Sequence, residues 1–242
     1  MTNYYSQHGE DYLLDLMFPD KNDGFFVEIG CIDGKRFSNT LYFEEKGWNG
    51  LCVEAHPDYI SLLKQNRPNS IVCHYAVGEK DEDDVVFYAN DRGSLSTLDK
   101  SQEARWKKNY TEYFHGFEEK RVAKRTLTSI FKENRLGHIN ILSLDIEGYE
   151  VPALQGLDLG LYQPDVLVIE TDGNEQKIQQ EKILSTQGYF DATSLSGNIF
   201  YVREQKLAAK VQNIVATVPL IQSRHPLDSG DDILVQKKVD TR

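Results

Sequence analysis

Glycines and acidic residues follow several short apolar segments of this sequence. The first segment, residues 25–29, runs into Gly30 and Gly34, and later segments end in Glu54 and Asp145. Apolar runs that stop at such residues are typical of buried parallel strands. Ligands of an open parallel sheet bind outside the carboxyl ends of its strands. We therefore expect a small-molecule site where these residues meet.

The glycine turn after the first strand differs from the dinucleotide fingerprint G-x-G-x-x-G/A. Gly30 and Gly34 let the backbone approach a ligand closely, but Ile32 stands where that fingerprint has its second glycine. Asp33 places a negative charge where a pyrophosphate would lie. A carboxylate-lined turn suits a cationic ligand, such as a sulfonium with an α-amino group. The turn favours S-adenosylmethionine over NAD. The candidates for binding it here are Glu28, Gly30, Asp33 and Gly34.

Two later strand ends complete the predicted cofactor site. Glu54 lies about 20 residues beyond the glycine turn, where a carboxylate can accept hydrogen bonds from both ribose hydroxyls, with Ala55 beside it. The alternative is an exposed strand-end carboxylate. Ala76 and Val77 form a small apolar bend after the third strand. This bend could hold an adenine ring or be an ordinary loop.

The fourth and fifth expected strands end in a run of acids. Asp145 would face the transferred methyl group and the acceptor hydroxyl, as a general base or as a ligand. If the two strands are neighbours, Asp145, Glu170 and Asp172 converge, and three oxygen ligands suit Mg²⁺ or Mn²⁺. One base with solvated carboxylates is the alternative. Glu147 is a further candidate, whereas Glu150 is expected to start a helix.

An irregular block, residues 85–125, separates the two halves of the chain. It is rich in aromatic and basic residues without a clear period, and we expect a lid or substrate-selecting insertion over the site. A solvated surface helix with Trp106 packed inward is the alternative. His115 in this block is the second candidate for the catalytic base. His138 precedes its strand and is expected at the opposite end of the sheet.

Alternating strands and helices predict the frame that positions these residues. The expected strands are residues 25–29, 51–54, 70–75, 139–145, 165–170, 189–192 and 198–203. The expected helices are residues 38–46, 57–67, 149–157 and 175–187. This order predicts a doubly wound, Rossmann-like α/β fold whose mostly parallel seven-stranded sheet ends in an antiparallel hairpin. One domain would span residues 1–203, followed by a helical or flexible tail at 204–242.

Composition and charge limit the class of protein. The 242 residues are 40% hydrophobic and 27% charged, as in ordinary soluble domains. A net charge of -11 argues against a dedicated nucleic-acid binder. No apolar run reaches the roughly 18 residues of a membrane span, and the polar start of the chain favours the cytoplasm. The three cysteines form no metal-binding spacing and are expected to be reduced thiols.

Four blocks together resemble the FkbM family of S-adenosylmethionine-dependent methyltransferases. They are residues 6–11 (SQHGED), 27–34 (VEIGCIDG), 53–55 (VEA) and 142–150 (LSLDIEGYE). The resemblance spans about residues 6–202 and implies a class I methyltransferase fold. One departure is Ser143, which stands two residues before Asp145, where many members carry lysine.

The resemblance also implies a reaction and a role for the N-terminal segment. The segment would fold over the cofactor site, with Gln7, Gly9 and Glu10 binding the cofactor. The reaction would be methylation of a hydroxyl of a sugar, a glycan or a small natural product. An NAD-dependent sugar oxidoreductase or epimerase, and a non-catalytic cofactor-binding module, are the alternatives. A homo-oligomer, paired through the tail helix, is left open.

Overall fold

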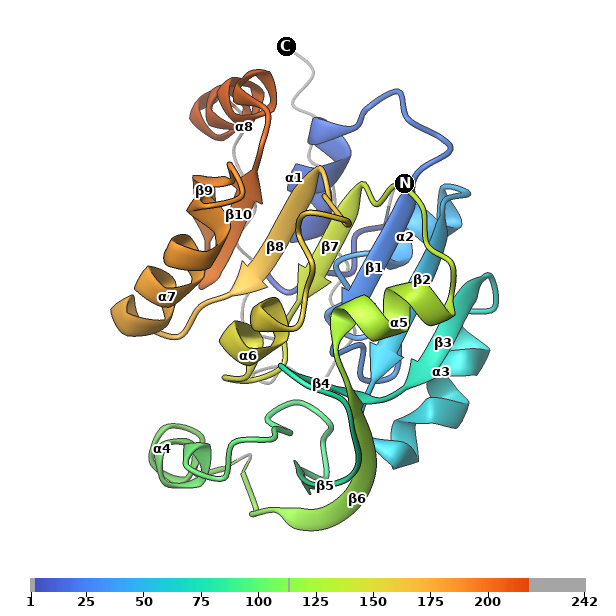
Figure 1. The fold of residues 1–242 in the computed structure, drawn as a ribbon, viewed down its shortest axis with the longest axis vertical. Helices are drawn as coiled ribbons and strands as arrows, with labels where there is room; N and C mark the ends of the chain where they lie inside the picture. Colours follow the sequence, from blue (N-terminus) through green and yellow to red (C-terminus); the bar gives the residue numbers. More distant parts are fainter. Residues whose placement is uncertain (1–2, 113, 218–242) are drawn as a thin grey trace.

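The structure is a computed structural model that describes residues 3–112 and 114–217, so Tyr113 and the tail beyond Thr217 lie outside the described residues. A seven-stranded sheet forms the centre of the molecule (Figure 1). Its strands are β1 (Phe25–Ile29), β2 (Asn49–Glu54), β3 (Ser70–His74), β7 (Ile141–Leu144), β8 (Val166–Glu170), β9 (Phe190–Leu195) and β10 (Asn198–Val202).

The strand order in space is β3-β2-β1-β7-β8-β10-β9. Strand β1 pairs in parallel with β2 on one side and with β7 on the other. Strand β8 runs parallel to β7, whereas β10 is antiparallel to both β8 and β9. The predicted parallel sheet with a terminal antiparallel hairpin is therefore confirmed. The order reverses between β1 and β7, and this switch point opens a crevice at the carboxyl ends of the strands.

The central strands are apolar because the sheet is covered on both faces. Val27 and Ile29 of β1 pack on one face of the sheet, and Phe26, just before them, packs on the other. In β7, Leu142 and Leu144 share the face of Val27. Successive side chains of a strand point to opposite faces, so a strand buried on both sides is apolar at almost every position.

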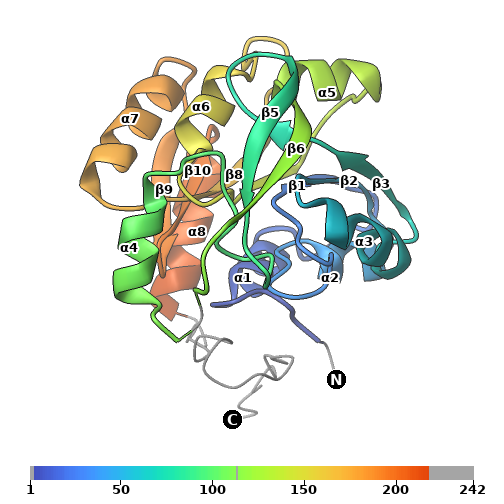
Figure 2. The ribbon, with the colours of Figure 1, turned by 90° about the horizontal axis from the view of Figure 1, so that it is seen from below.

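Two layers of helices cover these faces (Figure 2). One layer consists of α5 (Leu127–Glu133), α6 (Glu150–Gln155) and α7 (Asn174–Ser185). The other consists of α1 (Glu10–Met17), α2 (Leu41–Glu45), α3 (Ile60–Asn66), which follows the short helix η1 (Pro57–Tyr59), and α8 (Gln205–Thr217). The sequence patterns did not predict α1 or α5.

Helix α8 begins the region predicted as a tail. Its buried residues Ala208, Val211 and Ile214 belong to the apolar cluster that includes Leu13 and Leu14 of α1. The apolar face of α8 is thus used within the chain, although it was considered for pairing with a partner. Packing therefore continues through α8, beyond the domain boundary predicted at residue 203.

The block between the two halves forms a hairpin with a helix in its loop. Strands β5 (Glu82–Ala89) and β6 (Glu118–Arg125) are antiparallel, and β6 also pairs with the short β4 (Ala76–Val77). Helix α4 (Gln102–Asn109) lies in the connection, where Trp106 packs against Phe114 and Phe117. The insertion lies beyond the carboxyl ends of the central strands (Figure 1), the position expected of a lid.

The sequence was expected to contain reduced thiols and no membrane span. Cys31, Cys52 and Cys73 are all free thiols. Within the described ranges, no helix combines the length and the apolar character that crossing a membrane requires.

Candidate active site

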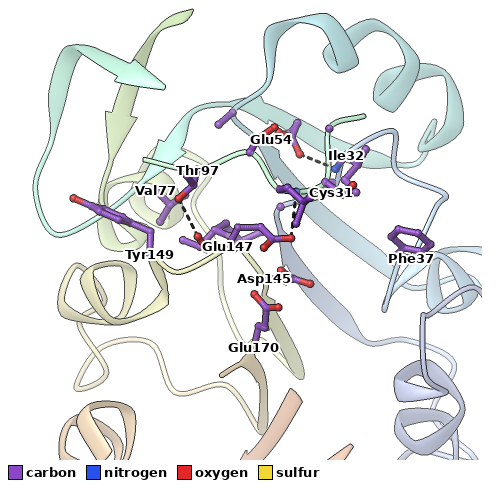
Figure 3. Close-up of a pocket in the computed structure, with 18 of the residues that line it drawn as sticks. Cys31, Ile32, Phe37, Glu54, Val77, Thr97, Asp145, Glu147, Tyr149 and Glu170 are labelled. Carbon is purple, nitrogen blue, oxygen red and sulfur yellow. Dashed lines mark hydrogen bonds between the residues drawn. The ribbon is translucent and has the colours of Figure 1, made fainter. Parts of the chain in front are cut away.

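A pocket opens at the carboxyl ends of β1, β2, β7 and β8. Its roof is the segment of residues 93–98 together with Arg105, Trp106 and Tyr110 of the insertion. Figure 3 shows the three acids Asp145, Glu147 and Glu170 close together, with Glu54 on the other side of the pocket. Ten of the residues predicted for the site line it: Gln7, Glu28, Gly30, Glu54, Ala55, Ala76, Val77, Asp145, Glu147 and Glu170.

The turn after β1 passes directly over the end of β7. Gly30 has φ +86°, and a Cβ at this position would lie 1.8 Å from the backbone carbonyl oxygen of Asp145. Only glycine therefore lets the two backbones come this close. Ile32 follows with φ +50°, a conformation that L-residues with branched side chains rarely adopt. The turn brings the N–H of Ile32 to the next strand end.

Glu54, at the end of β2, receives that N–H. Its Oε2 accepts a hydrogen bond from the Ile32 N–H at 2.6 Å, and its Oε1 accepts one from the His56 N–H at 2.7 Å. Burial raises the pKa of Glu54 to about 7, although these N–H donors oppose the rise. Each carboxylate oxygen accepts one bond and keeps a lone pair for a further donor, such as a hydroxyl of a diol.

The floor of the pocket carries three half-buried acids. Burial raises the pKa of Asp145 to about 6, and a hydrogen bond from Glu170 opposes that rise. The pKa of Glu170 is raised well above its usual range by burial and by the charge of Asp145. Burial and Asp145 also raise the pKa of Glu147 to about 8. Asp145 and Glu170 therefore form a pair in which Glu170 keeps its proton and donates it in a hydrogen bond to Asp145.

The model of the "Methyltransferase FkbM domain" matches residues 22–200 of the chain. This chain belongs to the FkbM methyltransferase family. The predicted resemblance is thus confirmed, and so is the prediction of an S-adenosylmethionine-dependent methyltransferase. No curated protein sequence matches the chain significantly.

Solved methyltransferases resemble the structure distantly. The ribosomal protein L11 methylase of Lactobacillus delbrueckii subsp. bulgaricus is 8% identical with a TM-score of 0.45, over 82% of this chain and 80% of that one. An O-methyltransferase of Bacillus cereus, in complex with SAH, is 10% identical with a TM-score of 0.44, over 81% and 80% of the two chains. A putative RNA methyltransferase of Pyrococcus horikoshii is 10% identical with a TM-score of 0.43, over 81% and 83%.

Glu28 of this FkbM chain lines the pocket but points its carboxylate into the protein. The carboxylate accepts hydrogen bonds from Ser38 Oγ at 2.8 Å and Thr40 Oγ1 at 2.7 Å. Arg67 Nη1 forms an ion pair with it at 2.9 Å, and both partners are buried. Glu28 therefore fixes the loop that leads into α2, and its carboxylate is already engaged by the protein.

Asp33 and Gly34 shape the turn and do not line the pocket. Oδ1 of Asp33 accepts hydrogen bonds from the N–H groups of Lys35 and Arg36 at 2.9 and 2.8 Å. A Cβ on Gly34 would come within 2.5 Å of Leu63. The charge of Asp33 is therefore directed at its own turn. The acids that face the pocket lie instead at the ends of β2, β7 and β8.

The N-terminal segment of this FkbM chain reaches the site, as the resemblance implied. Ser6 forms a parallel bridge with Phe37, and both Gln7 and Phe37 line the pocket. Gly9 and Glu10 lie behind the lining, at the start of α1. The buried carboxylate of Glu10 accepts hydrogen bonds from protein donors. Of the three residues predicted here, only Gln7 is placed to touch a ligand.

The second candidate base, His115, does not line the pocket. Its imidazole is 60% exposed, and Nδ1 lies 3.0 Å from Oδ2 of Asp91 in a separate groove of the insertion. This geometry contradicts its predicted catalytic role, because His115 lines a different groove. His138 pairs with Asp165 near the amino end of β8, away from the pocket, as expected.

The predicted metal triad is not assembled. Asp172 forms an ion pair with Arg105 of the insertion and is absent from the acidic cluster. Glu150 takes its place, since oxygens of Asp145, Glu150 and Glu170 lie within 4.8 Å of one another. Both oxygens of Glu150 already accept protein hydrogen bonds. The three carboxylates predicted as ligands therefore do not converge on one ion.

Several pocket residues were not predicted from the sequence. Four non-glycine residues with positive φ line the pocket: Glu147, which was a candidate, and Ile32, Phe37 and Leu95, which were not. Strained backbone of this kind gathers at ligand sites. Two lining residues, Arg36 and Ser94, carry buried polar atoms without a hydrogen-bond partner in the described part of the chain. Neither property leaves a motif in the sequence, because both depend on contacts with distant segments.

The acidic floor should make the ligand-free protein less stable as the pH rises. The folded protein holds protons on Asp145 up to about pH 6 and on Glu147 up to about pH 8, whereas unfolded carboxyls lose theirs near pH 4. The stability that these protons contribute is therefore fully present at low pH and is lost as the pH rises through this window. The free energy of unfolding falls by about 1.4 kcal/mol per pH unit for each extra proton that the folded state holds. Urea unfolding between about pH 5.5 and 8.5 measures this slope.

Glu147→Gln should flatten that slope, because it removes one of the titrating groups and keeps an oxygen for the Leu95 N–H. The exposed Glu133→Gln is the control and should leave the slope unchanged. Stability that rises with pH over this window in the wild type would contradict the assignment.

Proposed function

We propose that this FkbM methyltransferase transfers a methyl group from S-adenosylmethionine to a hydroxyl of a sugar, a glycan or a small natural product. The observation that supports this most is the position of Asp145. It lies at the switch point between β1 and β7, on the floor of the pocket. A carboxylate with a pKa of about 6 is largely ionised near neutral pH and can accept a proton from a hydroxyl.

The residues of the pocket fit the proposed cofactor. Glu54 keeps lone pairs for two ribose hydroxyls, and Ala76 and Val77 offer an apolar surface to a base. Asp145 places negative charge where a sulfonium and an ammonium group would be stabilised, and Glu147 would lose its proton when such a cation binds beside it. Ile32, which replaces the second glycine of the dinucleotide fingerprint, favours this cofactor over NAD.

Bound S-adenosylmethionine would supply an electrophilic methyl group. Asp145 accepts the proton of the acceptor hydroxyl, which makes the oxygen a better nucleophile. Glu170 keeps its own proton and, through its hydrogen bond, holds the Asp145 carboxylate in one orientation. The roof, which includes residues 93–98, covers the reactants, and the main contribution of the protein is their alignment.

Methyl transfer with labelled S-adenosylmethionine tests the proposal directly. The acceptors are neutral sugars, nucleotide sugars, glycans and small phenols or alcohols, each with Mg²⁺ or with EDTA. We expect label in a hydroxyl of one class. Label that enters only amine or RNA acceptors would contradict the O-methylation proposal, and loss of activity in EDTA would restore a metal to the mechanism.

Glu54→Ala should weaken the binding of S-adenosylhomocysteine by about tenfold or more, which corresponds to about 1.4 kcal/mol. The change removes two carboxylate oxygens that face the nucleoside end of the pocket. Isothermal calorimetry measures the affinity. The exposed Glu133→Ala serves as the control for loss of a carboxylate. Equal affinities of Glu54→Ala and the wild type would remove Glu54 from the ribose site.

A further inference from the structure

Glu150 is a fully buried carboxylate with no assigned role in the reaction. It is the first residue of α6, and its side chain accepts hydrogen bonds from the loop that precedes the helix. Oε1 accepts one from the Ile146 N–H at 2.9 Å and one from the Gly148 N–H at 3.1 Å. An acid that only starts a helix interacts with the helix terminus and needs no burial. Glu150 instead gathers two N–H groups of the loop after β7.

Those hydrogen bonds hold a strained backbone. Glu147 has φ +56° and Gly148 has φ +98°, so two consecutive residues are left-handed. Such a conformation is unfavourable for a residue with a side chain. The two N–H groups on either side of Glu147 both donate to Oε1 of Glu150, which stabilises this turn of the loop. One carboxylate oxygen therefore determines the shape of residues 145–149.

The same loop carries the contact with the roof. Oε1 of Glu147 accepts a hydrogen bond from the Leu95 N–H at 3.3 Å, and the carbonyl oxygen of Glu147 accepts one from Thr97 Oγ1 at 2.9 Å. Figure 3 shows Thr97 above Glu147, with Asp145 on the same loop. A change in the loop would therefore move the floor and the roof of the pocket together.

The second oxygen of Glu150 is fixed from the neighbouring helix. The side-chain amide of Gln176, in the first turn of α7, donates a hydrogen bond to Oε2 of Glu150. The carbonyl oxygen of the same amide accepts a hydrogen bond from the Asp172 N–H. The Gln176 amide thus donates to Glu150 and accepts from the loop after β8. These two hydrogen bonds connect that loop to Glu150 and fix the orientation of the amide.

We propose that Glu150, held by Gln176, is the positioning residue of the active site. It fixes the loop of residues 145–149, and through this loop it sets the orientation of Asp145 and the docking of the roof on Glu147. It touches neither reactant, since it does not line the pocket. The catalytic part of this inference rests on the proposed function of Asp145, whereas the part that concerns the roof does not.

A pair of exchanged side chains tests the proposal. Glu150→Gln keeps an oxygen for Ile146 and Gly148 but turns an amide donor toward the amide donor of Gln176. The double variant Glu150→Gln/Gln176→Glu restores complementarity, because the new carboxylate at position 176 accepts from both position 150 and the Asp172 N–H. The net charge of the pair is also restored. Glu175→Gln, exposed in the same turn of α7, is the control.

We expect Glu150→Gln to lower kcat by about 10- to 100-fold, the size of effect that a small misplacement of reacting groups produces. The KM for the acceptor and the affinity for S-adenosylhomocysteine should stay within about threefold, because neither ligand touches Glu150. The double variant should recover kcat to within about threefold of the wild type. Glu175→Gln should match the wild type in every measurement.

Hydrogen exchange tests the same proposal without a methyl acceptor. Hydrogen exchange of the Leu95 amide should be at least about tenfold faster in Glu150→Gln than in the wild type, and slow again in the double variant. Unchanged exchange and unchanged kcat in Glu150→Gln would overturn the proposal, as would a double variant no better than the single one. If the wild type transfers no methyl group, the proposed function fails and the exchange data still decide the role of Glu150.

Discussion

Asp145→Asn should lower kcat by about 10²–10⁴-fold, the contribution that general base catalysis typically makes. The asparagine side chain has the shape of the carboxylate but cannot take the proton of the acceptor hydroxyl. It can still accept a hydrogen bond from Glu170, so the floor of the pocket keeps its packing. The variant also removes one of the clustered negative charges, and the folded state should be at least as stable as the wild type above pH 6.

Two measurements separate a catalytic role of Asp145 from other roles. Turnover is followed with labelled cofactor, and the affinity for S-adenosylhomocysteine is measured by calorimetry on the same preparation. The exposed Asp20→Asn is the control for the loss of one carboxylate. Near-normal turnover of Asp145→Asn would assign proton transfer to another group. A parallel loss of affinity and turnover would make Asp145 a cofactor ligand.

The frame of the site could be predicted because topology brings strand ends together. The apolar runs at β1, β2 and β7 predict parallel strands buried on both faces. Parallel strands that are neighbours present their carboxyl ends at one edge, so Gly30, Glu54 and Asp145 must meet there. No side-chain detail enters this argument. The same reasoning predicts Glu170, which follows β8 on that edge.

The predictions that were wrong concern residues whose role depends on the direction of the side chain. Asp33 and Asp172 stand close to the pocket in sequence, but neither lines it: Asp33 accepts hydrogen bonds from N–H groups of its own turn, and Asp172 pairs with Arg105 of the roof. Glu150 has the sequence position of an ordinary helix-start acid, yet its carboxylate lies beside Asp145 and Glu170. Short-range hydrogen bonds and ion pairs decide these orientations. A sequence pattern gives the element on which a residue lies and does not give those partners.

Helix α1 and the roof show a second limit. Helix α1 buries three acids, Glu10, Asp11 and Asp15, beside its apolar residues, so its sequence has the appearance of a polar terminus. Asp11 is held by Ser6 Oγ at 2.6 Å, a contact that closes the N-terminal segment. The roof depends on the left-handed Leu95 and on bonds to residues some 50 positions away. Contacts of such long range leave no local periodicity.

Gly30→Ala should produce the largest loss of stability of any single change in the turn after β1. The added Cβ would lie 1.8 Å from the carbonyl oxygen of Asp145, which belongs to the backbone and cannot turn aside. The backbone at Gly30 is also left-handed. To make room, β1 and β7 must separate at the switch point, and the hydrogen bond from the Asp145 N–H to the Ile29 carbonyl must lengthen from 3.1 Å. We expect a loss above about 4 kcal/mol, or failure to fold.

Gly188→Ala is the matched control, because it separates the backbone conformation from the clash. Gly188 has φ +81° against +86° for Gly30, and a Cβ on Gly188 meets nothing within 4 Å among the described residues. This control should lose only about 1–2 kcal/mol, the cost of left-handed backbone alone. Urea unfolding measures both variants, and circular dichroism shows whether Gly30→Ala folds at all. Similar losses in the two variants would mean that the approach of β1 to β7 can relax. A loss much larger at Gly30 would show that this one backbone contact stabilises the fold and shapes the pocket. Asp145 takes part in both, because its carbonyl oxygen forms the contact with Gly30 and its carboxylate lines the pocket.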